Sequence, residues 1–207
     1  MIRIFHPVGQ GAFYTEHHQI RDKGFSIVYD CGSLTLNVEE RKKMIEDFFP
    51  KGAKIEILFI SHFDADHING IKALKDHCEI KRVIIPLLNP ETKTLLIARN
   101  AIRYKFFETQ IIDDPVSFFG DTPVTMVEEV SIGKDLDSEE EINEETIINE
   151  LGHKIKSGKS IRLDKKDNWY YIPYNYKQSD RRKQFVEALE AMGLRINDIN
   201  STLTDYL

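Results

Sequence analysis

The sequence predicts an α/β sandwich, in which a mixed β-sheet is covered by outer helices. Three observations indicate this fold class. Residues Ile55–Ile60 are almost wholly apolar, which is typical of a strand that is covered on both faces. Residues Val38–Phe49 place apolar side chains near one face of a helix, with charged side chains mostly opposite. Near the N-terminus, two short strands flank a turn at Gly9 and Gly11, which favours antiparallel pairing.

The front half of the chain alternates between short strands and helices that end at recognisable turn residues. A strand at Phe25–Tyr29 follows a turn at Gly24, and Pro50 with Gly52 ends the first helix. Pro86 lies near the end of a later strand, where an edge position tolerates its missing amide. The predicted front elements are strands at Met1–His6, Ala12–Glu16, Phe25–Tyr29, Ile55–Ile60 and Arg82–Leu88, and helices at Val38–Phe49 and Asn69–Cys78.

The back half continues with a long helix, a turn-rich connection, and a β-hairpin. Apolar side chains recur at helical spacing in Glu91–Phe107, and turn residues crowd the stretch from Asp113 to Gly120. A polar turn at residues 165–168 is expected to join two antiparallel strands. The predicted back elements are helices at Glu91–Phe107 and Ser179–Met192, strands at Val124–Val130, Ser160–Leu163 and Trp169–Pro173, and one or two helical turns in Asn197–Leu207.

Length and composition favour one domain spanning residues 1–207. A chain of 207 residues with 41% hydrophobic residues can bury one substantial core. The sequence has no apolar run long enough to cross a bilayer and no apolar core of a signal peptide, so no membrane partner is expected. Cys31 and Cys78 are the only cysteines, which favours reduced thiols and a cytoplasmic protein. Cys78 is expected to be buried at a helix end.

One acidic segment carries the negative charge of the chain. The net charge is −6, and residues 135–150 hold eight acids with no Lys or Arg. Such a run is expected to form a solvated flap, with a lid that repels anions as the alternative. A basic stretch follows it, which could contact phosphates or simply form a soluble surface. Its members are Lys154, Lys156, Lys159, Arg162, Lys165 and Lys166.

The most informative segment is Ser61–Gly70, which directly follows the apolar strand. It holds His62, Asp64, Asp66 and His67 within six positions. Imidazole and carboxylate groups lose hydration at such a place, and the acids repel each other unless a cation lies among them. Nitrogen and oxygen ligands suit a divalent transition metal, zinc first, with manganese or iron as alternatives.

Each of these residues also has an ordinary structural interpretation. Asp66 could cap a helix, His67 could be an unremarkable first-turn residue, and Asp64 could be a solvated loop acid. The joint pattern favours metal binding, because four ligand-type groups stand close together after a buried strand.

Three motifs together resemble the metallo-β-lactamase superfamily. The pattern His62-x-Asp64-x-Asp66-His67 is similar to the family's His-x-His-x-Asp-His, with Asp64 in place of the second histidine. This variant resembles the branch that contains competence-type DNA-uptake domains. Val8–Gly11 resembles the family's first tight turn, and Ser26–Gly32 resembles its second motif, a strand ending in Asp-x-Gly. The resemblance implies the first part of a metallo-β-lactamase-like sandwich.

The resemblance also implies a role for each residue of the motif. His62 and Asp64 would hold a first metal ion, and Asp66 and His67 a second. Asp66 would also orient the attacking water, which makes it the expected catalytic residue. Asp30 would orient a ligand imidazole or the motif loop, with a strand-end cap as the alternative. Zinc is the expected ion, and the carboxylate of Asp64 makes manganese an alternative.

The rest of the family's site has few matching residues. His153 is the only histidine downstream of His77 and is the candidate third ligand of the first metal, with a surface histidine as the alternative. The strand Trp169–Pro173 is not followed by a Gly-Asp pair, and no histidine follows His153. Either the chain is the front part of a longer fold or the site is degenerate. We expect the first.

The function that these observations favour is a metal-dependent hydrolase. The resemblance implies that a metal-bound hydroxide attacks an ester or a phosphodiester, so the partner is a small molecule or a phosphodiester substrate, with nucleic acid as one form of it. The alternative is a non-catalytic metal-binding or interaction domain with an incomplete site. A redox-partnered relative of the same fold is a third hypothesis that only the motif supports. The sequence leaves the substrate and the oligomeric state open.

Overall fold

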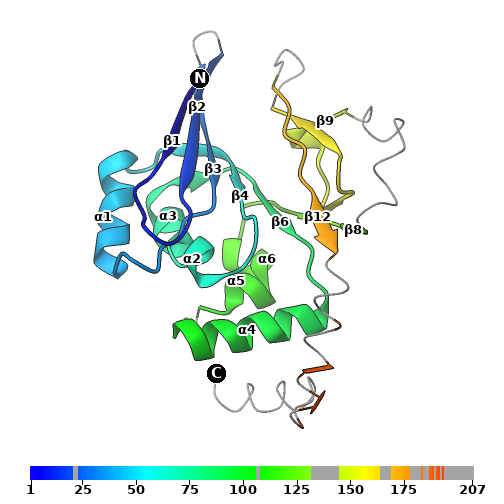
Figure 1. Ribbon diagram of the computed structural model, residues 1–207. Coiled ribbons are helices and arrows are strands. Elements are labelled where there is room, and N and C mark those ends of the chain that lie inside the picture. The colour runs from blue at the N-terminus through cyan, green and yellow to red at the C-terminus, as the bar shows by residue number, and fades with distance from the viewer. Residues whose placement is uncertain are drawn as a thin grey trace. The chain divides into compact units, whose positions relative to one another are not determined.

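The structure of the chain is a computed structural model (Figure 1). It describes residues 1–20, 23–105, 108–131, 145–163 and 169–177, together with single positions between 183 and 193. The chain divides into two compact units. Unit 1 comprises Met1–Pro86, Asp114–Met126 and Gly152–Lys154, and unit 2 comprises Leu87–Asp113, Val127–Leu151 and Ile155–Leu207. The single domain that the sequence predicts stays a prediction.

Unit 1 is built on a mixed β-sheet. The first strand pairs with the second, and the second with the third, in antiparallel fashion. The third strand pairs with the fourth, and the fourth with the sixth, in parallel. Parallel strands end at the same edge of a sheet, so the residues that follow two neighbouring parallel strands lie side by side. In sheet order the strands are β1 (Ile2–Phe5), β2 (Tyr14–Ile20), β3 (Lys23–Tyr29), β4 (Lys54–Phe59), β6 (Val83–Pro86), β7 (Val124–Val127) and β10 (Lys154–Ile155), with β5 (Glu79–Ile80) beside β4.

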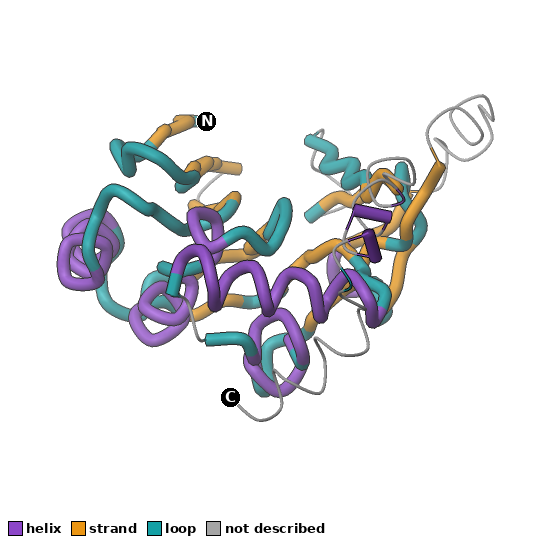
Figure 2. Tube along the Cα trace, turned by 60° about the horizontal axis from the view of Figure 1, so that its bottom comes forward, coloured by secondary structure: helices purple, strands orange, loops and turns teal. Residues whose placement is uncertain are grey.

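The helices of unit 1 are α1 (Val38–Phe48), α2 (Ala65–Ile68), α3 (Ile71–His77) and α6 (Pro115–Phe119). The side chain of Asn37 caps α1 by accepting a hydrogen bond from the Glu40 amide over 3.0 Å. In return the Glu40 side chain accepts from the Asn37 amide, which completes a capping box. Helix α1 packs against α3. Helices and strands of the chain are distinguished by colour in Figure 2.

The core of unit 1 lies around β4. Ile55, Ile57 and Leu58 have no exposed surface, so side chains that point to both faces of this strand are buried. This confirms the prediction from the apolar run. The neighbouring strands and the helix α3 contribute further buried side chains, namely Ile27, Val28, Val83, Ile84, Ile71 and Leu74. The predicted α/β class with a mixed sheet and helices is therefore confirmed.

Unit 2 contains one long helix and two small parallel strand pairs. Helix α4 (Pro90–Tyr104) begins after the Asn89 cap and contacts α5 (Gln110–Asp113). The strand pairs join β9 with β11 and β8 with β12. The bounds of the remaining elements are β8 (Glu129–Ser131), β9 (Glu145–Ile147), η2 (Ile148–Glu150), β11 (Ser160–Arg162) and β12 (Asn175–Lys177). None of the described helices combines the length and apolar character that crossing a membrane requires.

Several sequence predictions differ from the structure in detail. The connection at Asp113–Gly120 contains the helix α6, because Pro115 opens it and the Asp114 side chain accepts from the Ser117 amide. The strand predicted at Val124–Val130 is divided into β7 and β8. The helix predicted at Asn69–Cys78 begins only at Ile71.

The predicted hairpin is confirmed in part. Ile161 and Tyr171 form an antiparallel bridge with two reciprocal backbone hydrogen bonds of 2.9 Å, but β11 pairs in parallel with β9. The expected turn at 165–168, the helical turns in 197–207, most of the helix at 179–192, and residues 135–144 of the acidic flap lie outside the described residues. The end of that flap is described and forms β9 and η2. Cys31 and Cys78 are free and buried, as expected.

Candidate metal centre

The site begins where β3 and β4 end together. Tyr29 and Phe59 are register partners in these parallel strands, and the amide of Asp30 donates to the Phe59 carbonyl over 2.8 Å. Asp30 has a left-handed backbone conformation, with φ of 53°, that turns the chain out of β3. This pairing brings Asp30 beside Ser61, the first residue of the motif that contains the two histidines.

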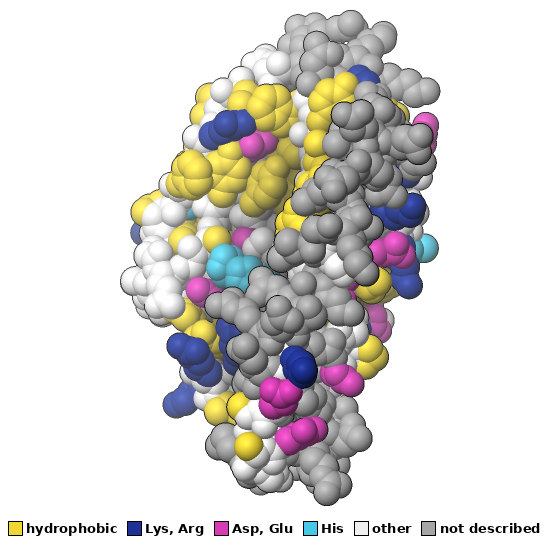
Figure 3. Space-filling view, turned by 45° about the vertical axis from the view of Figure 1, so that its right-hand side comes forward, with side chains coloured by type: hydrophobic (Ala, Val, Ile, Leu, Met, Phe, Trp, Pro, Cys, Tyr) yellow, Lys and Arg dark blue, Asp and Glu magenta, His cyan; other side chains and the backbone are white. Residues whose placement is uncertain are grey.

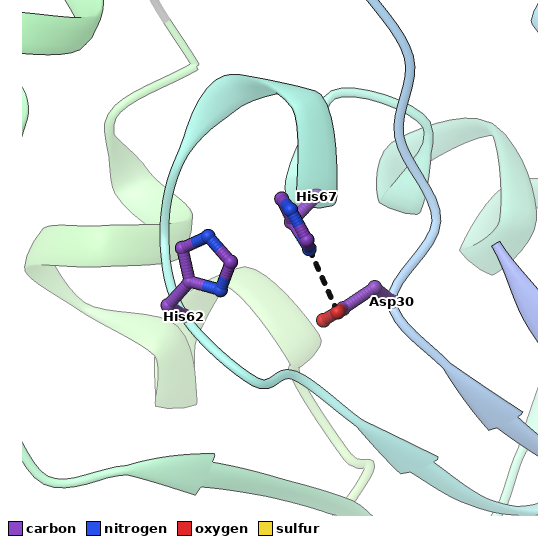
Figure 4. A group of neighbouring side chains, drawn as sticks. All are labelled: Asp30, His62 and His67. Atoms are coloured by element: carbon purple, nitrogen blue, oxygen red, sulfur yellow. Dashed lines mark hydrogen bonds and ion pairs between the residues drawn. The ribbon is translucent and has the colours of Figure 1, made fainter. Parts of the chain in front are cut away.

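The carboxylate of Asp30 binds three donors. Its Oδ1 accepts from the Ser61 amide over 2.7 Å, and its Oδ2 accepts from the Ser61 hydroxyl over 2.6 Å. Oδ2 also accepts from Nδ1 of His67 over 2.8 Å (Figure 4). Only 5% of Asp30 is exposed, so these contacts replace water around a buried charge. Asp30 thereby fixes the start of the loop and the ring of His67.

The motif loop is anchored by apolar side chains and enters α2. Phe63, Ala65 and Ile68 are each about 1% exposed. Asp64 occupies the N-cap position of α2, but its side chain makes no capping hydrogen bond. The structural alternative for Asp66 is therefore wrong, because Asp66 lies in the first turn of the helix rather than at its cap. Asp64 and Asp66 are both half-buried.

Two glycines allow the upstream motifs to lie against this loop. A Cβ on Gly32 would come within 2.5 Å of the Asp66 backbone and 2.7 Å of the His67 carbonyl carbon. A Cβ on Gly11 would lie 2.6 Å from the Asp66 carbonyl oxygen. The close approach permits backbone bonds, such as the 2.9 Å bond from the Cys31 amide to the His67 carbonyl. The three motifs of the sequence therefore form one contiguous structure.

The four ligand-type side chains of the motif are arranged as two imidazole–carboxylate pairs. Nε2 of His62 lies 3.6 Å from Oδ2 of Asp64, and Nε2 of His67 lies 3.9 Å from Oδ2 of Asp66. The two imidazole rings contact each other, with centroids 3.8 Å apart and planes tilted by 49°. Figure 4 shows both rings beside Asp30. Ligand atoms of Asp30, His62 and His67 all lie within 4.8 Å of one another, close enough for the three residues to hold one metal ion.

The two imidazoles have different electrostatic surroundings. Burial and then the neighbouring His67 lower the pKa of His62, and the nearby carboxylates only partly oppose this. Burial also acts to lower the pKa of His67, but the hydrogen bond and charge of Asp30, with Asp66 and Asp64, raise that pKa above its usual value. A metal ion binds either ring only in its neutral form, through the unprotonated nitrogen.

The donor set fits a divalent cation. Asp30 accepts from Nδ1 of His67, so in the neutral ring Nε2 carries the lone pair and faces Asp66. A lone pair and a carboxylate that converge repel each other, and a cation between them converts this repulsion into coordination. Asp30 accepts hydrogen bonds from the Ser61 amide, the Ser61 hydroxyl and Nδ1 of His67, and the last of these bonds orients the His67 ring.

The remaining candidate ligand, His153, lies apart from this group. His153 is exposed, and among the described residues it does not belong to the group that gathers around Asp30. Sequence reasoning missed the contacts of Ser61, which precedes His62 directly and touches both Asp30 and His62. The sequence shows only that Ser61 stands next to a ligand-type residue. Its contact with Asp30 depends on the pairing of β3 with β4.

An aromatic row leads across the sheet toward this edge. Phe5, Tyr14, Tyr29 and Phe59 are successive cross-strand partners, with ring centroids 4.6, 5.3 and 4.8 Å apart. Phe5 is 82% exposed on the edge strand, whereas Phe59 is buried two positions before Ser61. Figure 3 shows hydrophobic side chains gathered on one face of the molecule, with histidine side chains at the surface nearby.

Comparison with known protein families agrees with this geometry. The model of the metallo-beta-lactamase superfamily matches residues 20–148, which is more than half of the chain. The chain belongs to the metallo-β-lactamase superfamily. No curated protein and no solved structure matches it.

The matched range contains both Asp30 and the whole histidine–aspartate motif. Members of the metallo-β-lactamase superfamily bind divalent metals, so the family and the local donor geometry point to the same kind of centre. The metallo-β-lactamase-like fold that the sequence predicts is confirmed, and within it the centre lies at the shared end of β3 and β4.

Proposed function

We propose that this chain is a metal-dependent hydrolase that cleaves an ester or a phosphodiester. The observation that carries the proposal is the pair of contacts between His62 and Asp64 and between His67 and Asp66, at 3.6 and 3.9 Å. These are the two pairs that the superfamily motif assigns to two neighbouring metals.

Each residue has a defined task in this proposal. His62 and Asp64 hold one metal, and Asp66 and His67 hold the other, with zinc as the proposed ion and manganese as the alternative. Such ions lower the pKa of a bound water and polarise an ester or phosphoryl oxygen. Asp66 orients the attacking water, and Asp30 keeps the His67 ring in place through the 2.8 Å bond to Nδ1.

The substrate class and the location of the protein belong to the same proposal. The replacement of a histidine by Asp64 resembles the competence-type branch, which favours a phosphodiester over other esters and admits nucleic acid. The negative charge of Asp64 also lowers the net positive charge of the site and hardens its ligand set. Cys31 and Cys78 are buried free thiols, which supports a cytoplasmic location.

Metal content and hydrolysis test the proposal together. Protein purified without chelator is expected to carry two equivalents of metal and to hydrolyse bis(p-nitrophenyl) phosphate or p-nitrophenyl acetate. His67→Ala should lose metal and turnover. Asp76→Asn is the matched control, because Asp76 is exposed in an ion pair with Lys72 and should change neither. Turnover that survives in His67→Ala would refute the proposal.

A non-catalytic metal-binding domain is the second candidate. It is favoured by the grouping of only three ligand-type residues, Asp30, His62 and His67, within 4.8 Å among the described residues. Such a site would hold one ion for stability. One or zero equivalents of metal, together with no turnover of either chromogenic substrate, would establish this alternative and exclude the hydrolase.

His153 is the proposed third ligand of the first metal. Its imidazole is exposed at the edge of unit 1, where the His153 carbonyl accepts from the Met126 amide over 2.8 Å. Substitution of the side chain therefore leaves the backbone pairing intact. If His153→Ala loses one metal equivalent, the residue is a ligand. An unchanged metal content would remove it from the site.

A further inference from the structure

Ser61 connects the buried carboxylate of the centre to its more exposed histidine. Its Oγ lies 2.6 Å from Oδ2 of Asp30 and 2.9 Å from Nδ1 of His62. We propose that Ser61 is a positioning residue that fixes the His62 ring with Nδ1 protonated and with Nε2 available to a metal ion. This inference rests on the metal-binding part of the proposed function.

The direction of the two hydrogen bonds follows from the chemistry of their partners. The carboxylate of Asp30 can only accept, and a serine hydroxyl has one proton to donate. At 2.6 Å that proton lies between Ser61 and Asp30, because the opposite arrangement would bring two sets of oxygen lone pairs together. The Ser61 oxygen then accepts from Nδ1 of His62 at 2.9 Å. The neutral ring must therefore carry its proton on Nδ1.

One buried carboxylate thus determines the orientation of both imidazoles. Asp30 acts on His67 directly, over 2.8 Å, and on His62 through the hydroxyl of Ser61. In the neutral rings, both Nε2 atoms are left unprotonated. They point to Asp64 and Asp66, which lie 3.6 and 3.9 Å away. Both nitrogen ligands are therefore oriented before a metal ion binds. Hydrogen-bonding groups that orient a metal ligand in this way affect metal affinity by about 10–100-fold.

Removal of the hydroxyl is expected to leave the fold intact. Ser61 is exposed, so water can reach the groups that lose a partner. Asp30 keeps the Ser61 amide on Oδ1 and His67 on Oδ2. The Ser61→Ala variant therefore isolates the orientation of His62 from the stability of the loop.

The chain offers a matched control for this substitution. Ser26 is also a serine within reach of a histidine, because its Oγ lies 3.0 Å from Nδ1 of His17. That contact lies in β2 and β3, outside the metal centre. Ser26→Ala removes the same kind of hydrogen bond and is expected to leave the His62 ring and metal affinity unchanged. Ser61→Thr keeps a hydroxyl and should restore both properties.

The test measures the tautomer of His62 and the affinity for zinc separately. Long-range proton–nitrogen NMR of the metal-free protein at about pH 8, where an imidazole of ordinary pKa is neutral, reports which ring nitrogen is protonated. We expect a protonated Nδ1 in the wild type and in Ser61→Thr, and a shift toward protonated Nε2 in Ser61→Ala. Competition with a chromogenic chelator should show zinc affinity about 10–100-fold lower in Ser61→Ala alone.

Four outcomes have defined consequences. A wild-type His62 with protonated Nε2 would overturn the inference, and so would a tautomer that Ser61→Ala leaves unchanged. In protein that binds zinc, a zinc affinity that Ser61→Ala leaves unchanged would also overturn it. Wild-type protein with the expected tautomer but no zinc binding would refute the metal-dependent hydrolase, while the tautomer shift in Ser61→Ala would still support the positioning of His62. A failure of this inference can therefore be told apart from a failure of the proposed hydrolase function.

Discussion

Asp30 and His67, which are 37 residues apart in the sequence, share a 2.8 Å hydrogen bond between Oδ2 and Nδ1. This contact joins the end of β3 to the helix α2 and holds the imidazole with Nε2 toward Asp66. It is also the contact that links the second motif of the sequence to the metal motif. The properties of the centre therefore depend on a residue that lies outside the histidine–aspartate cluster.

Replacement of Asp30 by asparagine is expected to weaken metal binding. The amide keeps the size of the side chain, and asparagine tolerates the left-handed backbone at φ of 53°. However, asparagine has one acceptor oxygen in place of two, so it cannot accept all three hydrogen bonds from Ser61 and His67, and the His67 ring is expected to lose its orientation. Zinc affinity, measured by chelator competition, should fall by about 10–100-fold. Asp76→Asn, on the exposed surface of α3, is the control, and an equal loss there would contradict the role of Asp30.

Substitution of Gly32 by alanine should distort the metal loop. The added Cβ would lie 2.5 Å from the Asp66 backbone, which real side chains do not approach. Overpacking of this kind costs about 1–3 kcal/mol, and here the displaced backbone carries the ligands. We expect a lower urea midpoint and weaker zinc binding. Gly152→Ala, where the Cβ would meet nothing within 4 Å, should behave as wild type, and a wild-type Gly32→Ala would disprove the close approach.

Phe63 is expected to be the main apolar anchor of the motif. It is 1% exposed and lies between His62 and Asp64 in the chain. Truncation of a buried phenylalanine to alanine costs about 3–5 kcal/mol, which urea denaturation would measure. Phe5, which is 82% exposed, is the comparison, and Phe5→Ala should cost about 0.5 kcal/mol or less. Equal effects of the two substitutions would show that burial of Phe63 does not anchor the loop.

Acid should destabilise unit 1 through His6. Burial and then the neighbouring His17 lower the pKa of His6 to about 4. The unfolded chain has a histidine pKa near ~6.5, so it binds a proton more readily than the folded protein does. The stability that neutral His6 supports is complete above about pH 6.5 and is lost as the pH falls toward about 4.

The His6→Phe variant tests this dependence. The His6 ring stacks on Phe13 with centroids 4.0 Å apart and meets Phe48 edge-on at 4.3 Å, so an aromatic replacement keeps these contacts. The urea midpoint of each protein is measured at about pH 7.5 and at about pH 5. The drop in the midpoint between these two pH values should be smaller in the variant than in the wild type. A drop of the same size in both proteins would assign the acid sensitivity to other groups, such as His17.

Local sequence patterns were sufficient for much of the fold. The apolar run at Ile55–Ile60 predicted a strand buried on both faces, and the amphipathic pattern at Val38–Phe49 predicted the first helix. Apolar spacing records burial directly, so both features are visible without tertiary information. The connection at Asp113–Gly120 was misjudged, because its proline and aspartate serve as a helix start rather than as a turn.

The sequence by itself determined that imidazoles and carboxylates would gather after a buried strand, because these ligands are contiguous in His62–His67. The family resemblance suggested Asp30 as an orienting residue, and only the tertiary structure decided that it binds His67 and that Ser61 links it to His62. Asp30 reaches Ser61 across 31 positions and His67 across 37, since parallel pairing of β3 and β4 brings their ends to one edge. Glycine at positions 11 and 32 then lets the backbones touch. Such contacts depend on strand order and register, which no local pattern in the sequence records.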